Sequence, residues 1–99
     1  MKVNLKRSFK DFKGNEVKVN GQGVLISDEV GKILFNMGTS GNTPLSSDEK
    51  YMAYKLCNRI CRSGEIDLSA EEAAFIIKAC GEQLTAGAYG QVRDLIENK

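Results

Sequence analysis

FKDFKGNEVKVNGQGVLI, residues 9–26, is the stretch that decides the fold class. Its Gly14-Asn15 pair lies between two β-capable runs and is typical of a two-residue hairpin loop, because both residue types tolerate a positive φ. In that register Phe12 pairs with Val17 across the strands, and Phe9 lies on the opposite side of its strand. The sequence therefore predicts a β-hairpin near the start of the chain.

The predicted hairpin has one buried and one solvated face. Residues 17–19, Val-Lys-Val, alternate with period two, so the valines point inward and the lysine is solvated. The same register sets Lys13 opposite Glu16. A second turn at residues 20–23 leads into the apolar run 24–26, which is a candidate third short strand.

Amphipathic segments after the hairpin predict about four helices. Their expected ranges are about 27–37, 47–63, 70–81 and 86–98. Ser27 is the expected N-cap of the first helix, and Gly38 is its expected end. Ser-x-x-Glu spacing at Ser46 and Ser69 predicts capping boxes at the starts of the second and third helices. Gly81 is expected to end or fray the third helix.

The apolar faces of these segments define the expected core. The inward-facing residues are expected to be Val30, Ile33, Leu34, Met37, Ala53, Leu56, Cys57, Ile60, Cys61, Ala73, Ile76, Ile77, Cys80, Ala88, Val92, Leu95 and Ile96. Residues 38–45 form a polar stretch that is expected to be a mobile loop. The fold class is therefore α+β, with an N-terminal β-hairpin packed on about four α-helices in a single domain over residues 1–99.

No residue pattern indicates catalysis. The chain contains no histidine, which removes the ordinary Ser–His and Cys–His nucleophile pairs and every histidine metal ligand. We therefore expect a non-enzymatic protein with no cofactor.

The three cysteines are expected to be structural. Cys57 and Cys61 lie four residues apart on one expected helix face, and Cys80 lies on another. A structural zinc site needs four ligands at tighter spacing, whereas free cysteines commonly pack as small hydrophobic residues. Because no signal peptide and no membrane-spanning run accompanies them, we expect a reducing, cytoplasmic location without membrane contact.

Positive charge is concentrated near the start of the chain. Residues 1–20 hold six basic and two acidic side chains, although the net charge of the whole chain is +1. The candidate binding surface combines these basic side chains with an interleaved aromatic: Lys6, Arg7, Phe9, Lys10, Lys13 and Lys18. This surface could hold phosphates and stack bases of a nucleic acid. Alternatively, the lysines solvate the strands and discourage edge pairing while Phe9 anchors a protein partner.

The order of these patterns resembles that of short bacteriophage and prophage proteins. The resemblance rests on FKDFKGNE at 9–16, VGKIL at 30–34, AYKL at 53–56 and IDLSAEE at 66–72. It covers most of the chain and consists of folding signals, so it carries over no catalytic residue. It implies a phage context, the cytoplasm of a host cell, and a host or virion protein as binding partner.

The leading hypothesis is a non-enzymatic phage or prophage accessory protein that acts by protein–protein binding. Self-association into a homo-oligomer stays open, because a core of this size without tryptophan gains stability from a partner. The alternative is a nucleic-acid-binding protein that uses the basic hairpin.

Overall fold

The structure is a computed structural model that describes residues 1–98. Its helices are α1 (Ile26–Phe35), α2 (Ser47–Arg62), α3 (Ala70–Gln83) and α4 (Ala86–Glu97). Antiparallel pairs join β1 (Lys2–Asn4) to β6 (Glu65–Asp67), β2 (Lys18–Val19) to β3 (Gln22–Gly23), and β4 (Thr39–Ser40) to β5 (Thr43–Pro44). The predicted α+β class, with an N-terminal hairpin and four helices, is confirmed.

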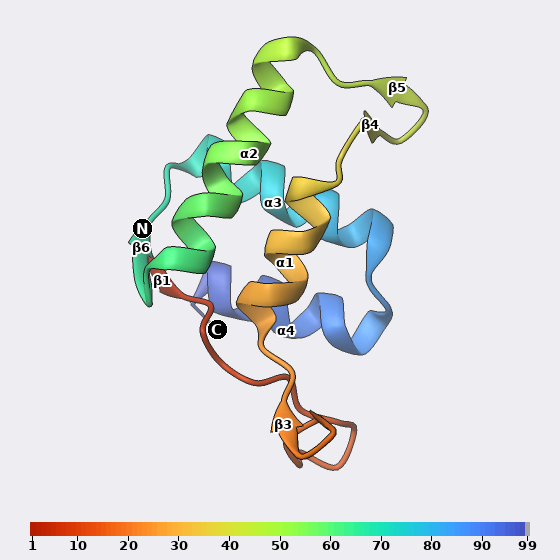
Figure 1. Cartoon of the computed structure of the whole chain (residues 1–99), viewed down its shortest axis with the longest axis vertical. Coiled ribbons are helices and arrows are strands. Elements are labelled where there is room, and N and C mark those ends of the chain that lie inside the picture. Colours follow the sequence, from red (N-terminus) through yellow and green to blue (C-terminus); the bar gives the residue numbers. More distant parts are fainter. Residues whose placement is uncertain (99) are drawn as a thin grey trace.

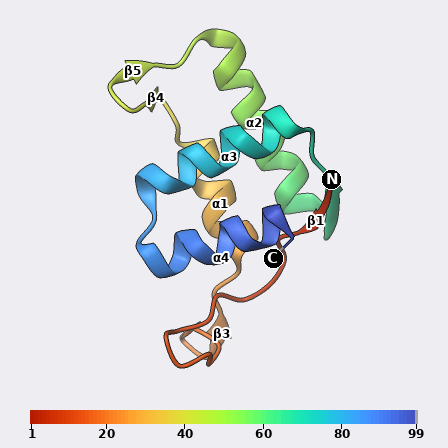
Figure 2. The same ribbon diagram turned by 180° about the vertical axis from the view of Figure 1, so that it is seen from behind.

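Helix α1 occupies the middle of the molecule. It packs against α2 and α3, and α4 packs against α3 (Figure 1). Seen from behind, α3 and α4 form a layer that covers α1 (Figure 2). The N-terminal hairpin and the β4–β5 hairpin lie at opposite ends of the longest dimension, which measures 39 Å.

The core lies where the four helices meet the N-terminal segment. Val30, Ile76, Cys80 and Val92 have no exposed surface at all. Leu5 and Leu68, which flank β1 and β6, close one end of this core. Among residues 1–98 no helix combines the length and the apolar composition needed to cross a bilayer.

Capping boxes start two of the helices, as predicted. The Ser46 hydroxyl accepts the Glu49 N–H at 3.1 Å, and the Glu49 carboxylate accepts the Ser46 N–H at 2.9 Å. Ser69 and Glu72 repeat this arrangement at the same two distances. Each box satisfies amides that the first helical turn would otherwise leave without partners.

Helix α1 does not use the predicted Ser27 cap. Leu25 is the N-cap residue and makes no side-chain cap, while Ser27 is only 1% exposed. The irregular segment after β1 supplies the acceptors, because Ile26 N–H donates to the Arg7 carbonyl and Ser27 N–H donates to the Leu5 carbonyl, each at 2.8 Å. Helix α1 also ends at Phe35, short of the predicted residue 37.

Gly81 does not end α3, contrary to the prediction. The helix continues to Gln83, and the ring of Tyr89 from α4 lies over the glycine, 3.3 Å from where a Cβ would stand. Tertiary packing against α4 therefore offsets the low helix propensity of glycine at this position.

Residues 38–45 form the short β4–β5 hairpin where an irregular loop was expected. Gly41 turns the chain with a φ of +62° and donates its N–H to a Glu82 carboxylate oxygen on α3 at 3.1 Å. Leu45 is buried, and its N–H donates to the Gly38 carbonyl at 3.0 Å. The hairpin is thus attached to the rest of the protein at its turn and at its base.

Candidate functional site

The N-terminal hairpin contains three short segments, and each is hydrogen-bonded to the other two. Phe9 N–H donates to the Val24 carbonyl at 2.9 Å, and the Phe9 carbonyl accepts the Val17 N–H at 2.8 Å. Val24 N–H donates to the Val17 carbonyl at 3.0 Å, which joins the remaining two segments. A third short strand is present, but it is β3 at Gln22–Gly23 and not the expected residues 24–26, where Leu25 only bridges to Ser8 and Ile26 begins α1. The three segments form a small closed unit below α1 (Figure 1).

The register of the first turn differs from the prediction. Lys10, and not Lys13, pairs with Glu16. The Asp11 carboxylate accepts the N–H groups of Lys13 and Asn15 at 2.9 and 3.0 Å, which widens the loop beyond two residues. Gly14 takes a positive φ of +86°, and the Asp11 N–H donates to the Asn15 carbonyl at 2.8 Å, so the turn spans residues 11–15.

This wider loop exchanges the expected roles of the two phenylalanines. Phe9 packs into the core beside Val17 and is 6% exposed. Phe12, expected to pair with Val17, stands in the loop and is 94% exposed. The prediction that Phe9 is the exposed anchor is wrong, and so is the expected burial of Val19, which is 60% exposed. The sequence signal for the correct register was Asp11, whose side chain commonly caps such a turn.

The basic side chains of the candidate surface are exposed, as expected. Lys13 stacks its ammonium group 5.7 Å from the centre of the Phe12 ring. Lys18 pairs with the Glu16 carboxylate at 3.6 Å, and a hydrogen bond from Ser8, helped by Lys18, lowers the pKa of that carboxyl. Lys6 and Arg7 precede the hairpin, and both are exposed.

Gln91 of α4 fastens the hairpin to the helical layer. Its side-chain oxygen accepts the Lys10 N–H at 2.8 Å, and its side-chain nitrogen donates to the Lys10 carbonyl at 2.9 Å. The sequence contained no signal for this contact, because the two residues are 81 positions apart.

A groove of about 390 Å³ runs between the hairpin and the start of α4. Phe12 and Val17 line one side, and Gly87 and Ala88 line the other. The small residues of α4 leave this space open, so the exposed Phe12 ring stands beside an apolar depression. A protruding aromatic next to a groove is the geometry that protein interfaces favour.

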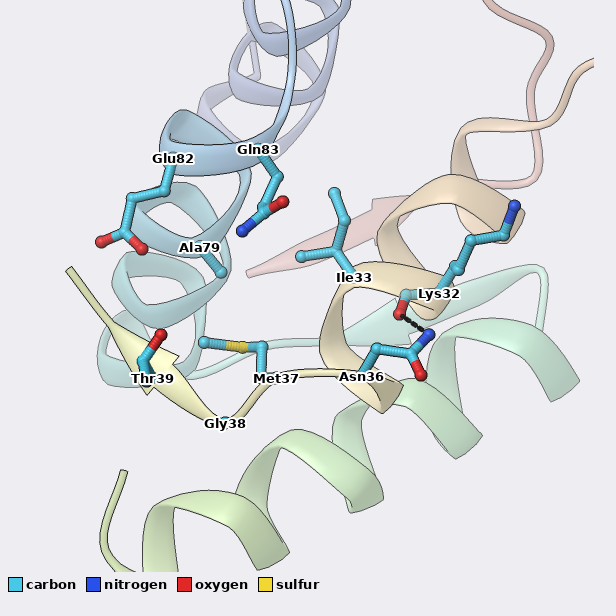
Figure 3. Close-up of a pocket in the computed structure, with 9 residues that line it drawn as sticks. All are labelled: Lys32, Ile33, Asn36, Met37, Gly38, Thr39, Ala79, Glu82 and Gln83. Carbon is cyan, nitrogen blue, oxygen red and sulfur yellow. Dashed lines mark hydrogen bonds between the residues drawn. The ribbon is translucent and has the colours of Figure 1, made fainter. Parts of the chain in front are cut away.

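A second cavity, of about 290 Å³, lies between the ends of α1 and α3 and strand β4 (Figure 3). Ile33, Met37 and Ala79 supply apolar lining. Figure 3 shows Gln83 facing Ile33 across the cavity, and Asn36 turned back to donate to the Lys32 carbonyl at 2.9 Å. The residues that line this cavity include no nucleophile–base pair, so the cavity has no evident catalytic chemistry.

Two of the three cysteines are buried and one is not. Cys57 and Cys80 lie in the core, whereas Cys61, also expected there, is exposed. Burial raises the pKa of the Cys80 thiol to about 12. Burial is also the main cause that raises the pKa of the Cys57 thiol, and the neighbouring Cys61 raises it further. Over the described part of the chain no three Cys, Asp or Glu side chains converge as a metal-binding group.

Comparisons with protein-family models, curated proteins and solved structures find no match to this chain.

Proposed function

We propose that this protein is a non-enzymatic binding module whose hairpin docks onto another protein through Phe12. The observation that carries the proposal is the 94% exposure of Phe12 on a hairpin held in place by Phe9 and Gln91. A large aromatic that stays in water gains free energy when a partner buries it, and a preorganised loop loses little entropy on binding.

The surroundings of Phe12 indicate the chemistry of the partner. Lys13 lies over the ring, and Lys10 is exposed nearby in the same hairpin. The groove toward α4 has apolar and small residues in its lining, together with the polar residues Asp11, Glu29 and Gln91. A complementary surface would offer an apolar pocket with carboxylates at its rim. The resemblance of the sequence to phage accessory proteins suggests a host or virion protein in the bacterial cytoplasm as the partner.

Nucleic-acid binding by the hairpin is the less favoured function. Lys18 is paired with Glu16, and Lys6 and Arg7 lie outside the loop that carries Phe12. Few cations therefore remain beside the aromatic ring to contact a phosphate backbone.

Affinity capture from a bacterial lysate tests the proposal when three baits are compared. The wild-type chain and Phe35→Ala should retain the same partner, and Phe12→Ala should lose it. Phe35 is the matched control because it is 64% exposed on α1, away from the hairpin. With the purified partner, Phe12→Ala should weaken binding by about 1–3 kcal/mol.

Equal retention by the Phe12→Ala bait would contradict the proposal. Loss of binding in Lys10→Glu/Lys13→Glu together with release by nuclease would instead support the nucleic-acid alternative. A concentration-dependent mass in sedimentation that Phe12→Ala abolishes would identify a second copy of the chain as the partner.

A further inference from the structure

We infer that the outward face of α2 binds single-stranded nucleic acid. This aromatic-basic face consists of Lys50, Tyr51, Tyr54, Lys55 and Arg62. Their spacing places them on one side of the helix, opposite the buried residues Ala53, Leu56 and Ile60. This face belongs to α2 and is separate from the hairpin.

Two exposed tyrosines form the centre of the face. The rings of Tyr51 and Tyr54 are stacked with their centroids 6.3 Å apart and their planes 18° from parallel. They are 62% and 49% exposed. Two nearly parallel rings that remain in water present flat π-surfaces on which bases of any sequence can stack.

The charge of the face is mainly positive, although Asp48 and Glu72 lie beside Tyr51 and Lys55. From residue 50 to residue 62 the chain contains four basic side chains and no acidic one. Lys55 lies 5.2 Å from the centre of the Tyr51 ring. Within residues 1–98, neither Lys50 nor Lys55 nor Arg62 forms an ion pair, so their charges are available to phosphates.

Two of the three carboxylates near the face are engaged in hydrogen bonds or ion pairs. Glu72 is neutralised by Arg59 at 2.7 Å and also serves the Ser69 capping box. Glu49 accepts the Ser46 N–H in the other capping box. Asp48 lies in the first turn of α2, where the helix dipole favours a negative charge.

The positive charge of the aromatic-basic face also distinguishes between the molecules that could bind to it. A second copy of the chain meeting this face through a two-fold axis would bring lysines against lysines, which disfavours self-association here. An acidic peptide would satisfy the cations but would not use the stacked rings. Single-stranded nucleic acid uses both, because it offers phosphates and unstacked bases together.

The test is fluorescence anisotropy of a labelled mixed-sequence single strand of about 15 nucleotides, as DNA and as RNA, titrated with the full chain. We expect binding at low salt that weakens about a hundredfold for a tenfold rise in salt, since about three phosphate contacts give a slope near −2. Tyr51→Ala/Tyr54→Ala should weaken binding at least about tenfold, whereas Tyr51→Phe/Tyr54→Phe should keep it within about twofold, because phenylalanine retains the stacking surface.

The charge control uses the other basic surface. Lys55→Glu/Arg62→Glu should weaken binding at least about thirtyfold, and Lys10→Glu/Lys13→Glu, with the same change in net charge, should cost less than about fivefold. If circular dichroism shows that Lys55→Glu/Arg62→Glu fails to fold, Lys55→Gln/Arg62→Gln replaces it with the same expected direction.

Three outcomes would overturn the inference. They are the absence of any binding at low salt, an equal or greater loss on changing Lys10 and Lys13, and unchanged affinity in the tyrosine-to-alanine variant. Displacement by an oligoglutamate peptide at the same charge concentration as the oligonucleotide would assign the face to acidic peptides instead.

Discussion

Gln91 and Lys10 exchange two hydrogen bonds, in which the side-chain amide of one residue pairs with the backbone N–H and C=O of the other. The glutamine acts as a strand neighbour would, and so satisfies an edge of the hairpin that has no further strand beside it. A third bond, from the Gln91 side-chain nitrogen to the Gly87 carbonyl at 3.0 Å, fixes the amide on α4. The position of the candidate binding loop therefore depends on a residue near the other end of the chain.

Replacing Gln91 should release the hairpin from α4. We expect Gln91→Ala to lower the free energy of unfolding by about 1–2 kcal/mol, because two backbone groups of Lys10 lose their partner. Hydrogen exchange at the Lys10 amide should accelerate. Gln83→Ala is the control, since the side chain of that exposed glutamine makes no hydrogen bond among the described residues. An unchanged exchange rate at Lys10 would show that the two bonds do not persist in solution.

The two phenylalanines of the hairpin should differ sharply in urea denaturation. Phe9→Ala should cost about 3–5 kcal/mol of stability, because it removes a buried ring and leaves a cavity. Phe12→Ala should change stability by less than about 0.5 kcal/mol, since its ring is in water before and after folding. Similar losses for both variants would contradict the register described above.

Gly31 and Cys61 should be energetically coupled. A Cβ at Gly31 would lie 2.6 Å from the Cys61 sulfur and 3.7 Å from that of Cys57, so α1 approaches α2 closely at this point. Gly31→Ala should therefore destabilise the wild type. In a Cys61→Ala background the same change should be neutral or stabilising by up to about 1 kcal/mol, because alanine favours the helix. A double-mutant cycle measures the coupling, and additive effects would refute it.

Stability should decrease in acid partly through Glu72. The hydrogen bond from the Ser69 backbone, followed by the bond and charge of Arg59, lowers the pKa of this carboxyl from its ordinary value of 4.5. Its pKa is thus lower in the folded than in the unfolded chain. The stability that this lowered pKa contributes to the folded state is fully present above pH 4.5, and it is lost as the pH falls through the pKa of the folded state.

The variant Glu72→Gln tests this assignment, because glutamine still accepts the Ser69 N–H but does not titrate. Chemical denaturation between pH 3 and pH 6 should give a shallower pH dependence for this variant than for the wild type. Glu71→Gln, one residue away and outside the capping box, should keep the wild-type slope. Equal slopes for Glu72→Gln and the wild type would contradict the prediction.

The sequence by itself determined the features that depend on neighbouring residues. The capping boxes at Ser46 and Ser69 and the apolar faces of the helices arise from interactions over three or four positions, which a pattern records directly. The turn at Asn20-Gly21 belongs to the same class, since both residues adopt the positive φ that their types tolerate. The exposure of the basic side chains of the candidate surface was also predictable, because burying an unpaired charge is costly.

Local turn chemistry and tertiary packing together decided which phenylalanine of the hairpin faces water. The Gly14-Asn15 pair favoured the register in which Phe12 faces Val17. The Asp11 carboxylate instead accepts two N–H groups of the loop, which favours the register in which Lys10 pairs with Glu16. Burial of Phe9 beside Val17 and Val24 stabilises this second register. A change of register reverses the environment of every side chain that it moves, so this local choice exchanged Phe9 and Phe12. The pairing of β1 with β6 and the contact of Lys10 with Gln91 join residues more than 60 positions apart. Such contacts form only once the helices have brought the distant segments together, and no short stretch of the sequence encodes them.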